Sequence, residues 1–104
     1  MRLRQTILQD ALETYGAYTQ TMMVFEEMAE LTKELTKNMR GADNREHIAE
    51  EIADVLIMLD QMIILHNCAG LVAQFKNRKI DRLNSRLRKE HEHEAGKNTE
   101  RKDT

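Results

Sequence analysis

The sequence predicts an all-α fold, and three observations lead to this prediction. The chain of 104 residues contains no proline, only 4 glycines and only 4% aromatic residues. Leu, Met, Ala, Glu, Lys, Arg and Gln are plentiful, and these residues lose the least free energy on entering a helix. Apolar residues also recur at intervals of three and four, which places them on one face of a helix. We therefore expect a single domain built as a four-helix antiparallel bundle.

The first predicted helix spans residues 3–14, and the second spans residues 18–39. Gly16 ends the first helix, because glycine readily adopts the left-handed conformation found at helix C-termini. Gly41 follows the second helix in the same way. The apolar stripe of this second helix consists of Met22, Phe25, Met28 or Ala29, Leu31 or Thr32, and Leu35.

The third predicted helix begins after Asp43 or Asn44, either of which can cap it, and continues to about His66. It is the most apolar stretch of the chain, so we expect it at the centre of the core. Gly70 marks the next break, and the fourth helix follows over residues 71–90. The apolar stripes of these two helices consist of Ile48, Ile52, Val55, Leu59, Met62 and Ile63, and of Val72, Phe75, Ile80, Leu83 and Leu87.

The last residues, 91–104, contain almost nothing apolar, so the sequence predicts an all-α domain over residues 1–90 and a disordered polar tail. A domain of this size buries only about two-thirds of its unfolded surface. The bundle is therefore expected to be completed by oligomerisation.

Charge and composition exclude several classes of partner and location. The net charge of −2 does not mark the chain as a binder of a nucleic-acid polymer or of a membrane surface. The only cysteine, Cys68, cannot form an internal disulfide, and no secretory signal is evident. No run of about 18 apolar residues could span a membrane. We expect a soluble, cytoplasmic protein.

Two acidic motifs carry the functional argument. Residues 26–30 and 50–54 both read acidic, acidic, apolar, alanine, acidic. Residues three apart on a helix lie on one face, one turn apart. On antiparallel neighbouring helices the two pairs could therefore face each other as a nest of four carboxylates, consisting of Glu27 and Glu30 with Glu51 and Asp54.

Such a nest is unfavourable unless a cation fills it, because like charges at short distance repel one another. Mg²⁺ is the natural cation, since it prefers oxygen ligands and binds substrate phosphates. The opposing interpretation is an ordinary solvated acidic face, because a single pair of this kind is common on exposed helices. The repetition on consecutive apolar helices, with no basic residue four positions after any of the four acids, favours a metal site.

In these motifs the chain resembles the MazG-like all-α nucleoside triphosphate pyrophosphohydrolases. Their signature, ExxE followed by ExxD on successive helices, is similar to Glu27-x-x-Glu30 and Glu51-x-x-Asp54 in order and spacing. The sequence that flanks both motifs is also similar to that of the family, with Gly16 preceding the first motif. The resemblance covers roughly residues 15–90.

The resemblance implies Mg²⁺-dependent hydrolysis of (deoxy)nucleoside triphosphates to a monophosphate and pyrophosphate, in a homodimer or homotetramer, with Mn²⁺ as a possible substitute. A housecleaning role against non-canonical nucleotides is also implied. Glu27, Glu30, Glu51 and Asp54 would be the metal ligands, and the accessory carboxylates Glu26 and Glu50 would orient the attacking water. The substrate contacts would come from Gln20, Lys33, Lys76, Asn77 and Lys79.

Two alternatives remain open. The chain could be a non-catalytic bundle that binds a protein partner through its acidic face, or a relative that binds nucleotides without hydrolysis. The few aromatic residues do not identify a base-stacking side chain, so the preferred base and sugar are not predicted. A dependence on divalent metal would distinguish the enzyme from a plain acidic surface.

Overall fold

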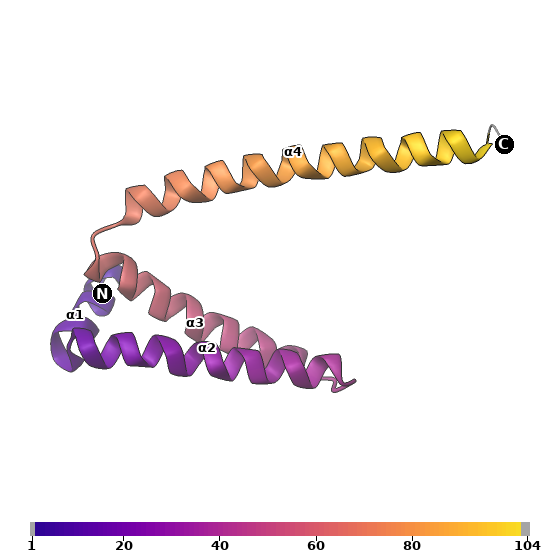
Figure 1. Cartoon of the computed structure of the whole chain (residues 1–104). Helices are drawn as coiled ribbons and strands as arrows, with labels where there is room; N and C mark the ends of the chain where they lie inside the picture. Colours follow the sequence, from indigo (N-terminus) through magenta and orange to yellow (C-terminus); the bar gives the residue numbers. More distant parts are fainter. Residues whose placement is uncertain (1, 103–104) are drawn as a thin grey trace. The chain divides into compact units, whose positions relative to one another are not determined.

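The computed structural model describes the backbone of residues 2–102 and the side chains of residues 2–96. Four helices and no strand occur in this part of the chain, so the predicted all-α class is confirmed. Helices also occur in the order and near the positions that the sequence predicts. They are α1 (Arg4–Tyr15), α2 (Ala17–Met39), α3 (Arg45–Leu65) and α4 (Ala69–Lys102), as shown in Figure 1.

The chain divides into two units, Met1–Cys68 and Ala69–Thr104. The first unit contains α1, α2 and α3, and the second contains α4. This boundary falls at the end of the predicted third helix, whereas the sequence predicts a boundary after residue 90. The packing of α4 in a four-helix antiparallel bundle stays a prediction.

Helices α2 and α3 pack side by side as an antiparallel hairpin (Figure 1). At one end of the hairpin, Gln20 near the start of α2 hydrogen-bonds to Gln61 near the end of α3. At the other end, Asn44 in the connecting loop hydrogen-bonds to Glu34 of α2. Helix α1 contacts both helices of the hairpin. The antiparallel packing predicted for these two helices is therefore confirmed.

Two glycines end helices as predicted. Gly16 has φ 92° and ψ 155°, and its N–H donates to the Leu12 carbonyl oxygen at 2.9 Å. It is the only residue between α1 and α2, so it sets the corner between them. Gly41, with φ 101°, lies in the turn after α2. Both backbones occupy the region of positive φ that side chains disfavour.

The break before α4 differs from the prediction. The residue of positive φ is Asn67, at 48°, and α4 already begins at Ala69. Gly70 therefore lies inside the first turn of α4 and does not form the break. Asparagine tolerates the left-handed region better than other residues with a side chain, which explains why the turn uses it.

The predicted end of the fourth helix also differs, because α4 continues past residue 90 to Lys102. The last two residues of the predicted polar tail lie outside the described residues. Its sequence is rich in Glu, Lys and Arg and contains no proline, and such residues favour a helix without any apolar contact. The absence of apolar residues therefore did not predict the backbone conformation.

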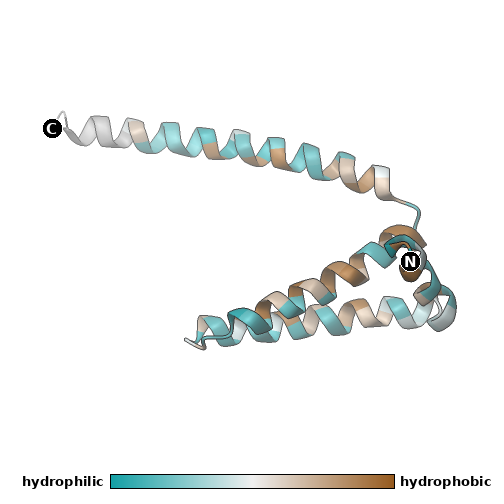
Figure 2. Ribbon diagram, turned by 180° about the vertical axis from the view of Figure 1, so that it is seen from behind, coloured by the Kyte–Doolittle hydropathy of each residue, from teal (hydrophilic) through white to brown (hydrophobic). Residues whose placement is uncertain are grey.

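The apolar core of the first unit is small. Only Leu12, Val24 and Met58 are buried apolar side chains in the described part of the chain. Figure 2 shows hydrophobic residues along much of α3, yet several of them are exposed there. The apolar stripe predicted for the core of α2 is also largely exposed, with Phe25 at 59%. The side of α2 that meets α3 instead carries polar residues, among them Gln20 and Glu27.

Candidate metal centre

Three carboxylates meet between α2 and α3. Glu27 comes from α2, whereas Glu51 and Asp54 come from α3, one helical turn apart. One carboxylate oxygen from each residue lies within 4.8 Å of the other two, and all three residues are half-buried. In the described part of the chain, this is the only group of three or more acidic, histidine or cysteine side chains so arranged. We call these three residues the carboxylate cluster.

The cluster is electrostatically uncompensated. Burial raises the pKa of Glu27 above its ordinary value, and the nearby Asp54 and Glu51 raise it further. Burial likewise raises the pKa of Glu51, and the charges of Asp54 and Glu30 raise it further. The Oε2 atom of Glu51 is buried and accepts no hydrogen bond. Neither of the two ion pairs found among the described residues involves the cluster.

The remaining predicted acidic residues surround the cluster without joining it. Glu30 is exposed and lies outside the group of three, although its charge raises the pKa of both Glu27 and Glu51. Glu26 and Glu50, the predicted accessory carboxylates, are also exposed on α2 and α3. The charge of Glu26 also raises the pKa of Glu27, and the charge of Glu50 also raises the pKa of Glu51. The structure thus brings together three of the four predicted ligands.

Glu34 is a further acidic residue near the cluster, and it lies outside both acidic motifs. Its charge contributes to the raised pKa of Glu51. Its own pKa is lowered, chiefly by a hydrogen bond from the Nδ2 atom of Asn44 to its Oε2 atom at 2.7 Å and further by Lys37. Because Glu34 follows Glu27 by seven residues, or two turns of a helix, the spacing could have placed both on one face.

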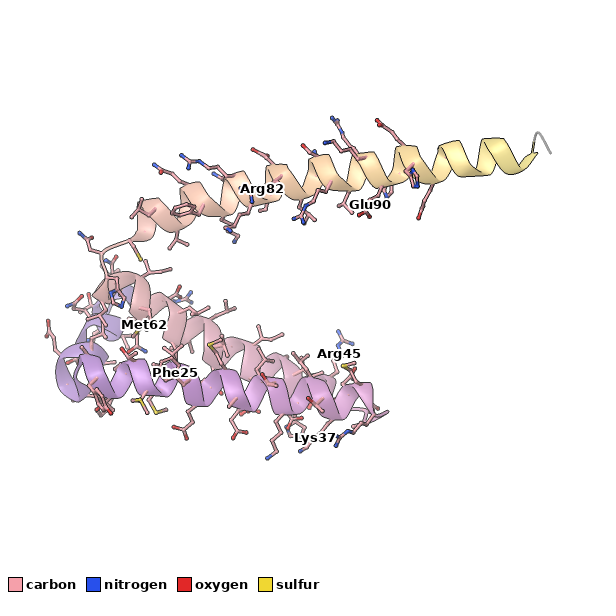
Figure 3. All side chains as sticks on the ribbon, viewed as in Figure 1. Phe25, Lys37, Arg45, Met62, Arg82 and Glu90 are labelled. Carbon is pink, nitrogen blue, oxygen red and sulfur yellow. The ribbon has the colours of Figure 1, made fainter. Side chains whose placement is uncertain are left out.

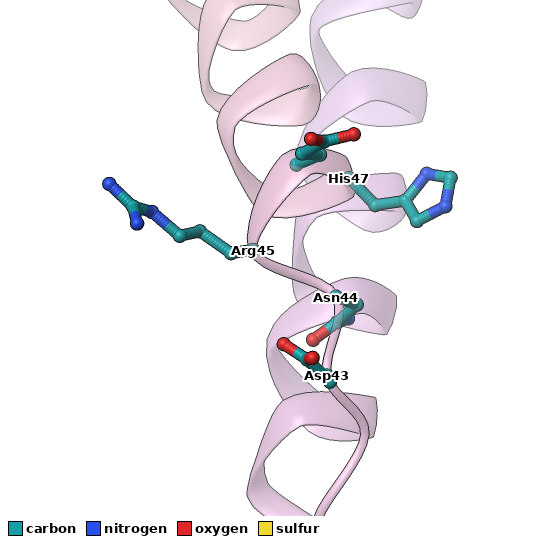
Figure 4. A pocket seen from close by; sticks show the side chains of 5 residues that line it. Asp43, Asn44, Arg45 and His47 are labelled. Carbon is teal, nitrogen blue, oxygen red and sulfur yellow. The ribbon is translucent and has the colours of Figure 1, made fainter.

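Asn44 holds the loop between α2 and α3. It is buried, and besides the bond to the Glu34 carboxylate its Nδ2 atom donates to the Glu34 carbonyl oxygen at 2.8 Å. It occupies the N-cap position of α3, as one of the two predicted residues, but its side chain bonds to α2 and makes no capping hydrogen bond. Figure 4 shows it in a pocket lined by Asp43, Asn44, Arg45, Glu46 and His47.

The predicted substrate contacts fall into three environments. Gln20 is buried, and its Nε2 atom donates to Oε1 of Gln61 at 2.8 Å. Lys33 is exposed on α2. Lys76, Asn77 and Lys79 are exposed on α4, in the second unit. Contact between any of them and a substrate stays a prediction.

A separate groove lies between the start of α1 and α3. Its apolar lining residues are Ile7, Leu8, Ala53, Leu56 and Ile57, and its charged ones are Arg2, Arg4 and Asp60. None of the predicted site residues lines it. This groove therefore contains no part of the predicted site.

The donor set of the cluster could hold a hard divalent cation. It consists of carboxylate oxygens only, which hard divalent cations prefer. The oxygen of Glu51 is buried without a partner, and the pKa values of Glu27 and Glu51 are raised by burial and by neighbouring carboxylates. A bound cation would offset this repulsion.

Comparisons of the chain with protein-family models, with curated proteins and with solved structures find no match. The functional argument therefore depends on the geometry of the cluster and on the motifs that form it. Among the described residues, none of the helices has the length and apolar character needed to cross a membrane.

Proposed function

We propose that this chain is a Mg²⁺-dependent hydrolase that splits (deoxy)nucleoside triphosphates into a monophosphate and pyrophosphate. The observation that supports a metal-dependent enzyme is the carboxylate cluster, in which oxygens of Glu27, Glu51 and Asp54 converge without a counter-charge. The reaction class comes from the resemblance of both acidic motifs to the MazG-like pyrophosphohydrolases. Housecleaning of the nucleotide pool is the biological role that this resemblance suggests.

In this proposal Glu27, Glu51 and Asp54 hold Mg²⁺, and Mn²⁺ could replace it. Glu30 would be the fourth ligand, since its charge already acts on two members of the cluster. When bound, the metal supplies positive charge that offsets the triphosphate and the negative charge developing in the transition state.

The surrounding side chains would position water and substrate. Glu26 and Glu50 are exposed beside cluster residues, so either carboxylate could orient a water molecule and accept its proton during attack on phosphorus. Cations from the chain would bind the phosphates, and an amide nearby would bind the sugar or base. The proposed contacts are Lys33, Lys76, Asn77, Lys79 and Gln20.

We also propose that the functional form is a homodimer or homotetramer. Rows of apolar side chains are exposed on both helices of the hairpin, for example Phe25 on α2 and Leu56 on α3. Exposed apolar surface of this extent is typical of a protein-protein contact. The same surface supports the second candidate function, a non-catalytic bundle that works as an interaction or nucleotide-binding module.

A pyrophosphate-release assay with Mg²⁺ tests the proposal on canonical, deoxy and modified nucleoside triphosphates. Release with monophosphate as the co-product is expected, and it should be lost in both Glu51→Gln and Asp54→Asn. Asp60→Asn is the matched control, because Asp60 lies on α3 outside the cluster, and it should retain activity.

Three outcomes separate the candidates. Full activity in both cluster variants would overturn the ligand assignment. No release from any substrate, with Mg²⁺ still raising the Tm, would favour a nucleotide-binding relative. No release of pyrophosphate, together with no effect of Mg²⁺ on the Tm, would favour the non-catalytic interaction bundle.

A further inference from the structure

The two units of the chain carry opposite charge, although the whole chain is nearly neutral. Residues 1–68 contain 6 Lys and Arg against 12 Asp and Glu, whereas residues 69–104 contain 10 against 6. Their formal net charges are therefore −6 and +4. Such an asymmetry between two parts of a chain is typical of proteins that bind a nucleic acid or a membrane surface through the basic part.

The positive charge of α4 is concentrated between Lys76 and Lys89. This stretch holds 7 basic residues and a single acidic one, Asp81. Every side chain in it is exposed. The two ion pairs found among the described side chains both lie outside α4, so these cations have no carboxylate partner there. Arg78 lies over the Phe75 ring, 5.9 Å from its centroid.

Four of the cations form a straight row along α4. Arg78, Arg82, Arg86 and Lys89 follow one another at intervals of four, four and three residues, which places them on one face of the helix. The row is about 16 Å long at 1.5 Å per residue. Arg82, labelled in Figure 3, shows how such a side chain projects from the helix. We call these four residues the basic row.

The linear charge density of the basic row is close to that of a nucleic-acid strand. Four cations over about 16 Å of one helix face give one positive charge per about 4 Å. One strand of a DNA duplex carries one phosphate per about 3.4 Å of axis. Arginine supplies four of the seven cations, and its planar guanidinium group binds phosphate oxygens through two parallel hydrogen bonds.

We propose that the basic row of α4 binds the phosphate backbone of a nucleic acid without reading its sequence. This surface is distinct from the carboxylate cluster and does not depend on the proposed hydrolase activity. The overall charge of −2 hides it, because the acidic first unit offsets the basic α4. A bilayer of anionic headgroups imposes no linear spacing of charge, so the match of spacing favours a nucleic acid over a membrane.

Fluorescence anisotropy of the full chain with labelled, mixed-sequence DNA tests the proposal, using a short duplex and its single strand. With about four phosphate contacts, the affinity for the duplex should fall roughly a hundredfold between about 50 and 200 mM salt. A variant with Arg78, Arg82, Arg86 and Lys89 all changed to Gln should lose at least about tenfold in affinity at the lower salt concentration, with a shallower salt dependence. Gln keeps the helix propensity high, and circular dichroism verifies that α4 remains helical.

The matched control removes the same number of cations from the first unit. A variant with Arg2, Arg4, Arg40 and Arg45 all changed to Gln should bind the same DNA within about threefold of the original chain, because these four cations do not belong to the basic row. Polyglutamate and phosphatidylserine vesicles serve as competing anionic probes, and neither should bind as tightly as DNA.

Several results would overturn the proposal. These are the absence of DNA binding at the lower salt concentration, an equal loss in both variants, and binding to polyglutamate or to the vesicles as tight as to DNA. Salt-sensitive self-association that the basic-row variant abolishes, without any DNA binding, would instead assign the row to the acidic unit of a second copy.

Discussion

Gln20 and Gln61 form a buried hydrogen bond between α2 and α3. The Nε2 atom of Gln20 donates to Oε1 of Gln61 at 2.8 Å, and the two residues are only 6% and 3% exposed. The Nε2 atom of Gln61 in turn lies 3.6 Å from the sulfur atom of Met58. A polar pair therefore occupies a position that an apolar contact would normally fill in a hairpin of this kind.

Gln61→Leu should lower the free energy of unfolding by about 1–3 kcal/mol, because it leaves the Gln20 amide buried without its partner. Urea denaturation measures this change. The double variant with Gln20→Leu as well should recover part of the loss, since no unpaired amide then remains. If Gln20→Leu instead leaves stability unchanged and raises KM for nucleotides, the predicted substrate contact is the better description of Gln20.

Glu51→Gln should raise the Tm of the metal-free protein at neutral pH while abolishing turnover. The raised pKa of Glu51 means that its charged form is less favourable in the folded chain than in the unfolded chain. Removing that charge relieves the repulsion within the cluster. Mg²⁺ should raise the Tm of the original chain and have little effect on the variant. A lower Tm for the metal-free variant would contradict the account of an uncompensated cluster, and Asp60→Asn provides the comparison on the same helix.

The difference in stability between the Glu51→Gln variant and the original chain should depend on pH. Glu27 and Glu51 have pKa values raised above an ordinary value of 4.5, so the folded chain binds protons more readily than the unfolded one. Their stabilising contribution is full below pH 4.5 and is lost as the pH rises through the folded pKa values. The Tm gap between Glu51→Gln and the original chain should therefore close on acidification in metal-free buffer. A gap that stays constant from neutral pH to below that value would show that the charge of Glu51 is not its cause.

Asn44→Ala should destabilise the hairpin by about 1–3 kcal/mol. The buried Asn44 side chain donates to both the carboxylate and the carbonyl oxygen of Glu34, and the substitution removes that donor. Thermal denaturation measures the effect. Asp43→Ala is the neighbouring control, since Asp43 is exposed, and it should cost much less. Equal losses in both variants would point to the loop backbone as the source of stability.

Phe25→Gln should shift the proposed oligomer towards smaller species, with little effect on the helical content of the chain. Phe25 is 59% exposed on α2, so its ring contributes little to the packing of the first unit. Removing an apolar residue that anchors an interface costs on the order of 2 kcal/mol of binding free energy. Sedimentation velocity measures the change. A chain that is monomeric with and without this substitution would refute the proposed use of the surface.

The sequence predicted the helices well, because helix propensity and glycine conformation are local properties. The ends of α1 and α2 lie within one residue of the predicted positions, at Gly16 and Gly41. The break at Asn67 was missed because asparagine adopts a left-handed backbone only where the surrounding structure imposes it. The end of α4 lies beyond the predicted position because the apolar stripe stops before residue 90, whereas the helical backbone does not depend on that stripe.

The site was predicted less completely, because it depends on how two helices meet. Spacing alone identified Glu27, Glu51 and Asp54, which the structure brings together. Glu30 is exposed and lies outside the group, although Glu51 and Asp54 have the same spacing on α3 and both join it. Spacing therefore does not determine which members of a pair face the neighbouring helix. The bonds of Gln20 and Asn44 require the register between α2 and α3, and the sequence does not specify that register.

The corner at Gly16 has a consequence for how this chain tolerates mutation. Its φ of 92° combined with ψ of 155° belongs to a region that essentially only glycine occupies, so even Asn or Asp would be strained there. A saturation library at codon 16, selected for folded protein, should therefore return glycine almost alone. Neighbouring exposed positions such as Tyr15 and Ala17 should accept many residues. This one residue thus constrains the path of the chain between two helices, although no other atom would contact a β-carbon added to it.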